Sequence, residues 1–74
     1  MFTYNTWMNT HNGRPFIEIS AIKEITSSEL EDLMRENLPY KVHYFYTLAD
    51  AQSSWEEDCH QIEEYNLYQQ EEEL

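Results

Sequence analysis

The sequence predicts an α+β fold of order ββαβα, in which a three-stranded antiparallel sheet is packed by two helices. Three observations predict it. An Asn12-Gly13 dipeptide between two runs rich in aromatic and β-branched residues indicates a hairpin. A helix-capping sequence precedes apolar residues at helical spacing, and a long acidic segment near the C-terminus also has one apolar side. With 74 residues and no linker, the chain is expected to form one small domain, 1–74.

The hairpin strands are expected at 2–10 and 15–22, joined by a tight turn in which Asn12 and Gly13 tolerate positive φ angles. In the second strand, aliphatic residues alternate with polar ones, which is the pattern of a strand with one buried face. The residues expected to face the core are Ile17, Ile19 and Ala21.

The first helix is predicted to begin after Thr26, whose hydroxyl can accept a hydrogen bond from an unpaired backbone amide while Glu29 reaches back to complete a capping box. Ile25 precedes this cap and can pack against Leu30. Pro39 ends the helix. The apolar stripe of this helix comprises Leu30, Leu33, Met34 and Leu38.

A third strand is expected at 41–48, and its apolar content predicts a central or doubly covered position in the sheet. A helix connects it to the second strand, so those two strands are expected to be parallel. Placing the third strand beside the first then makes every neighbouring pair antiparallel. Both helices are expected to cover one face of this sheet.

The last helix is predicted to span 50–70 with Asp50 as its cap, and residues 71–74 are expected to fray. Its apolar side comprises Ala51, Trp55, Cys59, Ile62 and Tyr65. Acidic residues occupy the opposite and flanking side. Two pairs of them are each separated by seven residues, or about 10 Å along a helix axis, and these pairs are Glu56 with Glu63 and Glu57 with Glu64.

Acidic residues are concentrated in the last third of the chain. The segment 50–74 carries nine acidic side chains and no Lys or Arg, and the formal net charge of the chain is −11. Four basic residues are too few to displace the counterions of a phosphate backbone, so direct binding to DNA or RNA is disfavoured. A one-sided negative field instead favours a positively charged partner, such as the nucleic-acid groove of a protein. The predicted partner-binding residues are Glu56, Glu57, Glu63, Glu64, Tyr68, Glu71, Glu72 and Glu73.

Another interpretation of the carboxylates is a solvated surface that only keeps a small domain soluble. In that case the chain is expected to be a protein-interaction module, such as a phage adaptor or a subunit, that binds through apolar side chains including Trp7, Met8 and Phe45. A homodimer formed through a free edge strand is also left open.

No catalytic activity is expected, and no metal or other cofactor. A single glycine rules out a Gly-rich phosphate loop, and Cys59 on the apolar side of a helix is expected to be inert. Glu56, His60 and Glu63 place an imidazole between carboxylates. Cys59, however, projects about 100° away from His60 around the helix, so zinc ligands do not converge.

The sequence favours a cytoplasmic location, in the host cytoplasm if a phage encodes the chain. The lone Cys59 cannot form an internal disulfide, which fits a reducing compartment. No segment approaches the roughly 18 apolar residues of a membrane span. Residues 1–13 lack the basic start and the apolar run of a signal peptide.

Four short segments form a layout over about the first half of the chain: Tyr4-Asn5-Thr6, Asn12-Gly13, Phe16-Ile17-Glu18-Ile19 and Glu29-Leu30-Glu31. This layout resembles the first module of ArdA-type antirestriction proteins. A short acidic α/β chain with an unbalanced carboxylate helix is also similar to the small inhibitors that phages and mobile elements encode against host defence, including DNA-mimic antirestriction and anti-CRISPR proteins. The resemblance implies a non-enzymatic inhibitor that occupies the nucleic-acid groove of a restriction, CRISPR or recombination enzyme by imitating DNA or RNA.

Overall fold

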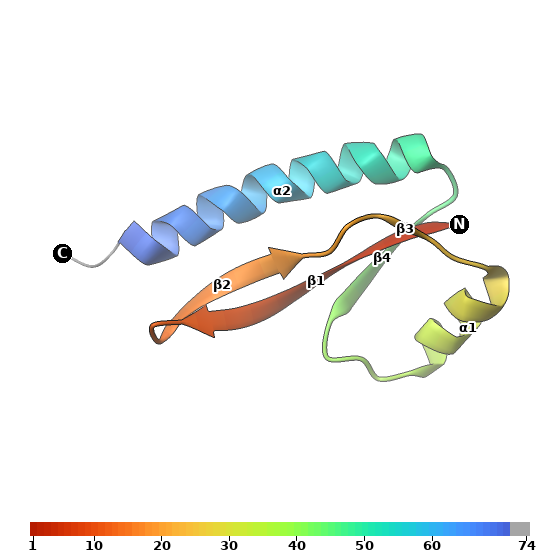
Figure 1. Ribbon diagram of the computed structural model, residues 1–74, viewed down its shortest axis with the longest axis horizontal. Coiled ribbons are helices and arrows are strands. Elements are labelled where there is room, and N and C mark those ends of the chain that lie inside the picture. The colour runs from red at the N-terminus through yellow and green to blue at the C-terminus, as the bar shows by residue number, and fades with distance from the viewer. Residues whose placement is uncertain (72–74) are drawn as a thin grey trace.

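The computed structural model describes residues 1–71, which form an α+β fold with an open antiparallel sheet and two helices (Figure 1). Along the chain the elements are β1 (Phe2–His11), β2 (Arg14–Ile19), β3 (Lys23–Glu24), α1 (Ser27–Arg35), β4 (Lys41–Phe45) and α2 (Leu48–Glu71). The observed order therefore differs from the predicted one by an additional short strand, β3.

β1 is the central strand of the sheet. The turn between β1 and β2 places Asn12 and Gly13 at φ angles of 54° and 75°, as predicted, because these residues adopt left-handed angles at low cost. β4 pairs antiparallel with the other side of β1, with His43 opposite Tyr4, which confirms the predicted placement beside the first strand.

The predicted central position of β4 is wrong, since β4 is an edge strand whose partner is β1. It also ends at Phe45, three residues before the predicted end at Leu48. The apolar content of β4 has another cause. His43 and Phe45 both stack on the ring of Tyr4, so one face of this strand is covered although only one of its edges is paired.

β3 follows β2 along the same side of β1, after a one-residue bulge. Thr6 pairs with Ile19, whereas Phe2 pairs with Glu24, so the register shifts by one residue between the two pairings. The second strand, predicted at 15–22, therefore ends at Ile19.

Ser20 holds the bulge in place. Its backbone N–H donates to the Asn5 carbonyl (2.9 Å), and its hydroxyl accepts a hydrogen bond from the Asn5 N–H (2.8 Å). The side-chain oxygen thus replaces a backbone carbonyl that the bulge has displaced. Ala21, which was expected in the core, is exposed because the alternation of the strand is broken here.

α2 lies along β2 and covers the outer edge of this strand (Figure 1). The side-chain amide of Asn66 accepts a hydrogen bond from the N–H of Ile17 (2.8 Å) and donates one to the C=O of the same residue (3.0 Å). An open strand edge normally exposes such groups as a template for another strand. Asn66 therefore takes the place of a further strand at this position.

Two other hydrogen bonds attach α2 to the same strand and its continuation. The indole N–H of Trp55 donates to the carbonyl of Ser20 at the bulge (2.8 Å). The guanidinium of Arg14 donates to the carbonyl of Gln69 (2.8 Å) in the last turns of the helix, where a cation also complements the helix dipole. The helix is thus attached to the sheet at both ends and near Asn66.

Tyr4 is the centre of the core beneath α2 and is only 1% exposed. Its ring stacks on His43 and Phe45 with centroid separations of 4.6 and 5.7 Å. Its hydroxyl donates to the carboxylate of Asp58 and lies 2.8 Å from the hydroxyl of Ser54. Burial, together with the Asp58 acceptor, raises the pKa of Tyr4 to about 12. The neutral phenol therefore joins β1 to β4 and to α2.

α1 lies on the side of the sheet away from α2. Thr3 and Asn5 alternate with Tyr4 and so face away from α2, and they line a shallow depression together with Leu33 of α1. Ile25 is buried in the same region. The expectation that both helices cover one face is therefore wrong, and the sheet separates the two helices.

Thr26 caps α1 as predicted, but Glu29 reaches the Thr26 hydroxyl rather than its backbone N–H, so the capping box is only partly formed. The Thr26 hydroxyl accepts a hydrogen bond from the N–H of Glu29 (3.2 Å). The same hydroxyl donates a long hydrogen bond to the Glu29 carboxylate (3.4 Å). The apolar stripe of the helix is only partly covered. The helix ends at Arg35, so Leu38 lies beyond it, and Met34 is largely exposed.

α2 begins two residues earlier than predicted. The hydroxyl of Thr47 accepts a hydrogen bond from the N–H of Asp50 (3.1 Å), so Thr47 rather than Asp50 caps the helix. Asp50 instead lies in the first turn, where its charge complements the helix dipole. At the other end Glu71 is still helical, whereas 72–74, also expected to fray, lie outside the described residues.

Replacing Asn66 with Asp tests the contact at the β2 edge. Aspartate keeps an acceptor for the N–H of Ile17 but has no donor for the C=O and places a negative charge beside it. We expect the free energy of unfolding, measured by urea denaturation, to fall by about 1–3 kcal/mol. Gln61→Glu is the matched control, because it makes the same amide-to-acid change at an exposed position of α2. It places a charge one turn from Glu57 and from Glu64, so it should cost only a few tenths of a kcal/mol per pair. Equal losses in the two variants would contradict the role of Asn66.

Titration of Tyr4 tests the core beneath α2. The difference in phenolate absorbance between the native protein and a Tyr4→Phe variant should show a midpoint of about 12, against the ordinary 10.0. Because the folded pKa is raised, the stabilisation from the neutral phenol is complete below pH 10.0 and is lost as the pH rises through about 12. A native midpoint at the ordinary value would show that the phenol is neither buried nor bonded to Asp58.

Candidate functional site

The structure brings five of the predicted partner-binding carboxylates to the exposed side of α2. These residues, called the acidic face below, are Glu56, Glu57, Glu63, Glu64 and Glu71. At about 100° per residue, Glu57, Glu64 and Glu71 form a row directed away from the sheet, while Glu56 and Glu63 lie on one flank of that row. Along the axis the acidic face extends over about 22 Å at 1.5 Å per residue.

Tyr68, the one predicted contact residue that is not acidic, is 63% exposed. It follows Glu64 by four residues and precedes Glu71 by three, so its ring lies beside the row of carboxylates. Glu72 and Glu73, which were also predicted to bind the partner, lie outside the described residues.

Charge on the acidic face is not neutralised by neighbouring bases. Within residues 1–71, no Lys or Arg lies within ion-pair distance of these five carboxylates, while the exposed His60 imidazole lies 3.3 Å from Glu64. The negative potential reaches the inner side of the helix as well. Burial raises the pKa of the Cys59 thiol, and the charges of Asp58, Glu56 and Glu63 raise it further, so this thiol is a poor nucleophile.

Two acids outside the acidic face, Asp58 and Glu18, have hydrogen-bonded roles in the fold. Asp58, on the inner side of α2, accepts the hydrogen bond of the Tyr4 phenol. Glu18 accepts hydrogen bonds from the indole N–H of Trp7 (2.8 Å) and the side-chain amide of Asn9 (3.2 Å). The acids of the acidic face differ from these two. Within residues 1–71 their only side-chain partner is His60, which lies beside Glu64.

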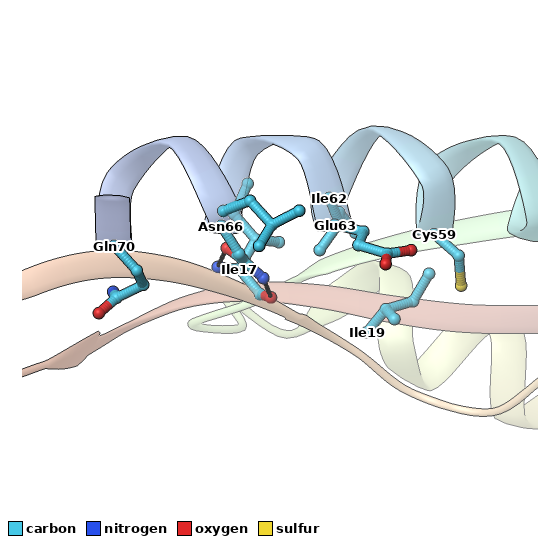
Figure 2. A pocket seen from close by; sticks show the side chains of 8 residues that line it. Ile17, Ile19, Cys59, Ile62, Glu63, Asn66 and Gln70 are labelled. Atoms are coloured by element: carbon cyan, nitrogen blue, oxygen red, sulfur yellow. Dashed lines mark hydrogen bonds between the residues drawn. The ribbon is translucent and has the colours of Figure 1, made fainter. Parts of the chain in front are cut away.

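A shallow apolar groove of about 460 Å³ runs between α2 and β2 next to the acidic face (Figure 2). Ile17 and Ile19 line it from the strand, and Ile62, Cys59 and Glu63 line it from the helix. The hydrogen bonds between Asn66 and Ile17 cross the groove. A carboxylate of the acidic face thus lies at the margin of an apolar surface.

Sequence reasoning missed Asn66 and Gln70. A polar side chain in an acidic helix is ordinarily assigned to solvent, but Asn66 follows Ile62 by four residues and therefore lies on the apolar side. That spacing is the signal that identifies it. The side-chain nitrogen of Gln70 is buried beside the groove without a hydrogen-bond partner among residues 1–71.

The cluster of potential metal ligands on α2 does not converge. Among the described residues, no three His, Cys, Asp or Glu side chains are placed to hold one metal ion. His60 faces Glu64 on the exposed side, whereas Cys59 lines the groove.

The apolar side chains considered for a protein-interaction module do not form one surface. Trp7 and Met8 line a depression of about 560 Å³ with Pro39 and Tyr40. Phe45 lies on the other face of the sheet, where it stacks on Tyr4.

No protein-family model, no curated protein and no solved structure matches this chain. In the part of the chain that the structure describes, no helix is both long and apolar enough to cross a membrane. The arrangement of side chains is therefore the ground on which a function is proposed.

Proposed function

We propose that the chain is a non-enzymatic inhibitor that places the acidic face of α2 in the positively charged nucleic-acid groove of a host enzyme. The target classes are restriction, CRISPR and recombination enzymes, whose grooves bind a phosphate backbone through Lys and Arg. The observation that carries the proposal is the outward display of five carboxylates that no Lys or Arg neutralises within residues 1–71.

This arrangement has an energetic cost that solubility does not require. Glu56 and Glu63, like Glu57 and Glu64, are about 10 Å apart along the helix axis, which is about one Debye length at 0.1 M salt, so their charges still repel one another. The carboxylates of the acidic face have no Lys or Arg beside them within residues 1–71. Surfaces of soluble domains usually carry interspersed charges of both signs. A basic groove relieves the repulsion in the bound state, so the cost in the free protein becomes a contribution to affinity.

The spacing of the carboxylates favours imitation of a single strand. Five charges that span about 22 Å have a mean separation of about 5.5 Å along the axis, compared with one charge per 3.4 Å along one strand and one per 1.7 Å for a duplex. Tyr68 adds an aromatic ring beside the charges, and a ring can stack on an Arg guanidinium as a base does.

A specific observation favours one other function, that of a protein-interaction module. Trp7, Pro39 and Tyr40 line a depression on the sheet face that α2 leaves uncovered. In this case the acidic face contributes solubility alone, and Trp7→Ala is expected to abolish binding while the acids are dispensable.

Affinity purification from nuclease-treated bacterial lysate, with proteins identified by mass spectrometry, distinguishes the two functions. Changing Glu56, Glu57, Glu63 and Glu64 to Gln should abolish recovery of a nucleic-acid enzyme. Recovery by the native chain should also fall steeply as salt rises above about 0.1 M, where the Debye length is about 10 Å. Added DNA or RNA should compete with it.

The matched control removes four negative charges from the other end of the molecule. These residues are exposed and are Glu24, Glu31, Asp32 and Glu36. Changing them to the corresponding amides alters the net charge equally, so recovery of the enzyme should persist. The Gln variant of α2 should be at least as stable as the native chain, because its lower net negative charge reduces self-repulsion. Equal recovery by the native chain and both variants would contradict the proposal and favour the apolar depression.

A further inference from the structure

The two edges of the sheet differ in what covers them. At the β2 edge, the N–H and C=O of Ile17 point away from β1 and are bonded to Asn66. At the β4 edge, no strand or side chain within residues 1–71 forms a hydrogen bond with the outward backbone groups. One edge is therefore closed and the other is open.

The register identifies which groups of β4 are open. Residues of an antiparallel strand point their N–H and C=O alternately to one neighbour and to the other. The backbone N–H and C=O of Ile17 point away from β1, so those of Met8, which lies opposite, point toward the β4 side. The backbone groups of Tyr4, four residues before Met8, point the same way. His43, opposite Tyr4, therefore bonds to β1, which leaves the N–H and C=O of Val42 and Tyr44 directed outward.

The chain around this edge contains no acidic residue. From 37 to 49 there is no Asp or Glu, although the net charge of the whole chain is −11. Aromatic side chains are exposed here instead: Tyr44 is 38% exposed and Tyr46 is 86% exposed. An edge strand is normally protected by charges that repel another strand, and β4 has only Lys41.

We propose that β4 pairs antiparallel with β4 of a second copy of this chain about a two-fold axis at His43. In this register Val42 lies opposite the partner's Tyr44, and Tyr44 lies opposite the partner's Val42. The four outward groups of each copy then form four hydrogen bonds between the copies, and all five residues of β4 overlap. The two sheets become one continuous sheet.

The side chains of β4 are complementary to themselves in this register, as an isologous contact requires. Val42 against the partner's Tyr44 is a β-branched residue against an aromatic one, which is a stabilising cross-strand pair. On the sheet face that α2 covers, Lys41 lies opposite the partner's Phe45. An unrelated extended peptide has no such match, so a second copy is the occupant that the strand favours.

The charge distribution is compatible with this pairing. α2 packs mainly over β2, at the far side of the sheet from β4. In the joined sheet the two β2 strands are five strand spacings apart, or about 24 Å at 4.8 Å per spacing. The two β1 strands, which the N-terminal half of α2 reaches through Tyr4, are three spacings apart, or about 14 Å. Both separations exceed the Debye length of about 10 Å at 0.1 M salt, so the acidic faces of the two copies repel each other weakly.

Sedimentation equilibrium of the full chain tests the pairing. The native chain should be in monomer–dimer equilibrium between about 10 μM and 1 mM, because a contact of this size lies at the weak end of protein interfaces. Tyr44→Lys places a charge on the edge and should abolish association. Tyr68→Lys makes the same substitution on α2 and should leave association unchanged. A folded native chain that remains monomeric throughout, or a Tyr44→Lys variant that associates as the native chain does, would overturn the proposal.

Disulfide cross-linking tests the register. In a Cys59→Ser background, His43→Cys should cross-link on mild oxidation, because directly opposed residues of a non-hydrogen-bonded pair have Cα atoms about 4.5 Å apart, within disulfide range. Lys41→Cys should cross-link slowly, since the two copies of that residue are four positions out of register, about 13 Å along the strands. Equal rates for the two variants, each shown to be folded by circular dichroism, would exclude a two-fold axis at His43.

Discussion

The position of α2 depends on the side-chain amide of Asn66, which bonds to both backbone groups of Ile17. These groups would otherwise need water or another strand. Rotating the helix by one residue, about 100°, would remove the amide from the strand edge and bring neighbouring side chains toward it. The same contact therefore fixes the fold and determines which residues of α2 face solvent. The outward direction of Glu57, Glu64 and Glu71 follows from it.

The two edges of the sheet give the molecule two surfaces of different chemistry. The β2 edge is closed by a helix whose outer side is acidic, while the β4 edge has no acidic residue and presents open backbone groups. If the chain both dimerises and binds a basic groove, the two acidic faces lie at opposite ends of one long sheet. A target with two symmetric grooves could then engage both ends, so that avidity would add to the affinity of each.

The sequence predicted correctly those features that depend only on residues adjacent in the chain. Asn12 and Gly13 form the turn because their φ angles are local, and Thr26 caps α1 for the same reason. The position of β4 at an edge was not predictable from its composition, because stacking on Tyr4 produces the same apolar pattern as a central strand. Among the candidate site residues, exposure of the acids followed from helical periodicity. The hydrogen bonds of Asn66 could not be predicted in this way. Helical periodicity shows on which side of the helix Asn66 lies, but not which group it contacts.

The bulge at Ser20 changes the phase of one strand. Before it, Ile17 and Ile19 present their side chains to α2, whereas after it Ile25 is buried on the face that carries Thr3. One continuous strand with unbroken alternation would direct all three isoleucines to the same layer. The inserted residue lets a single strand supply apolar side chains to two layers, one on each side of the sheet. A short chain thereby obtains a second hydrophobic contact without the length of an additional strand.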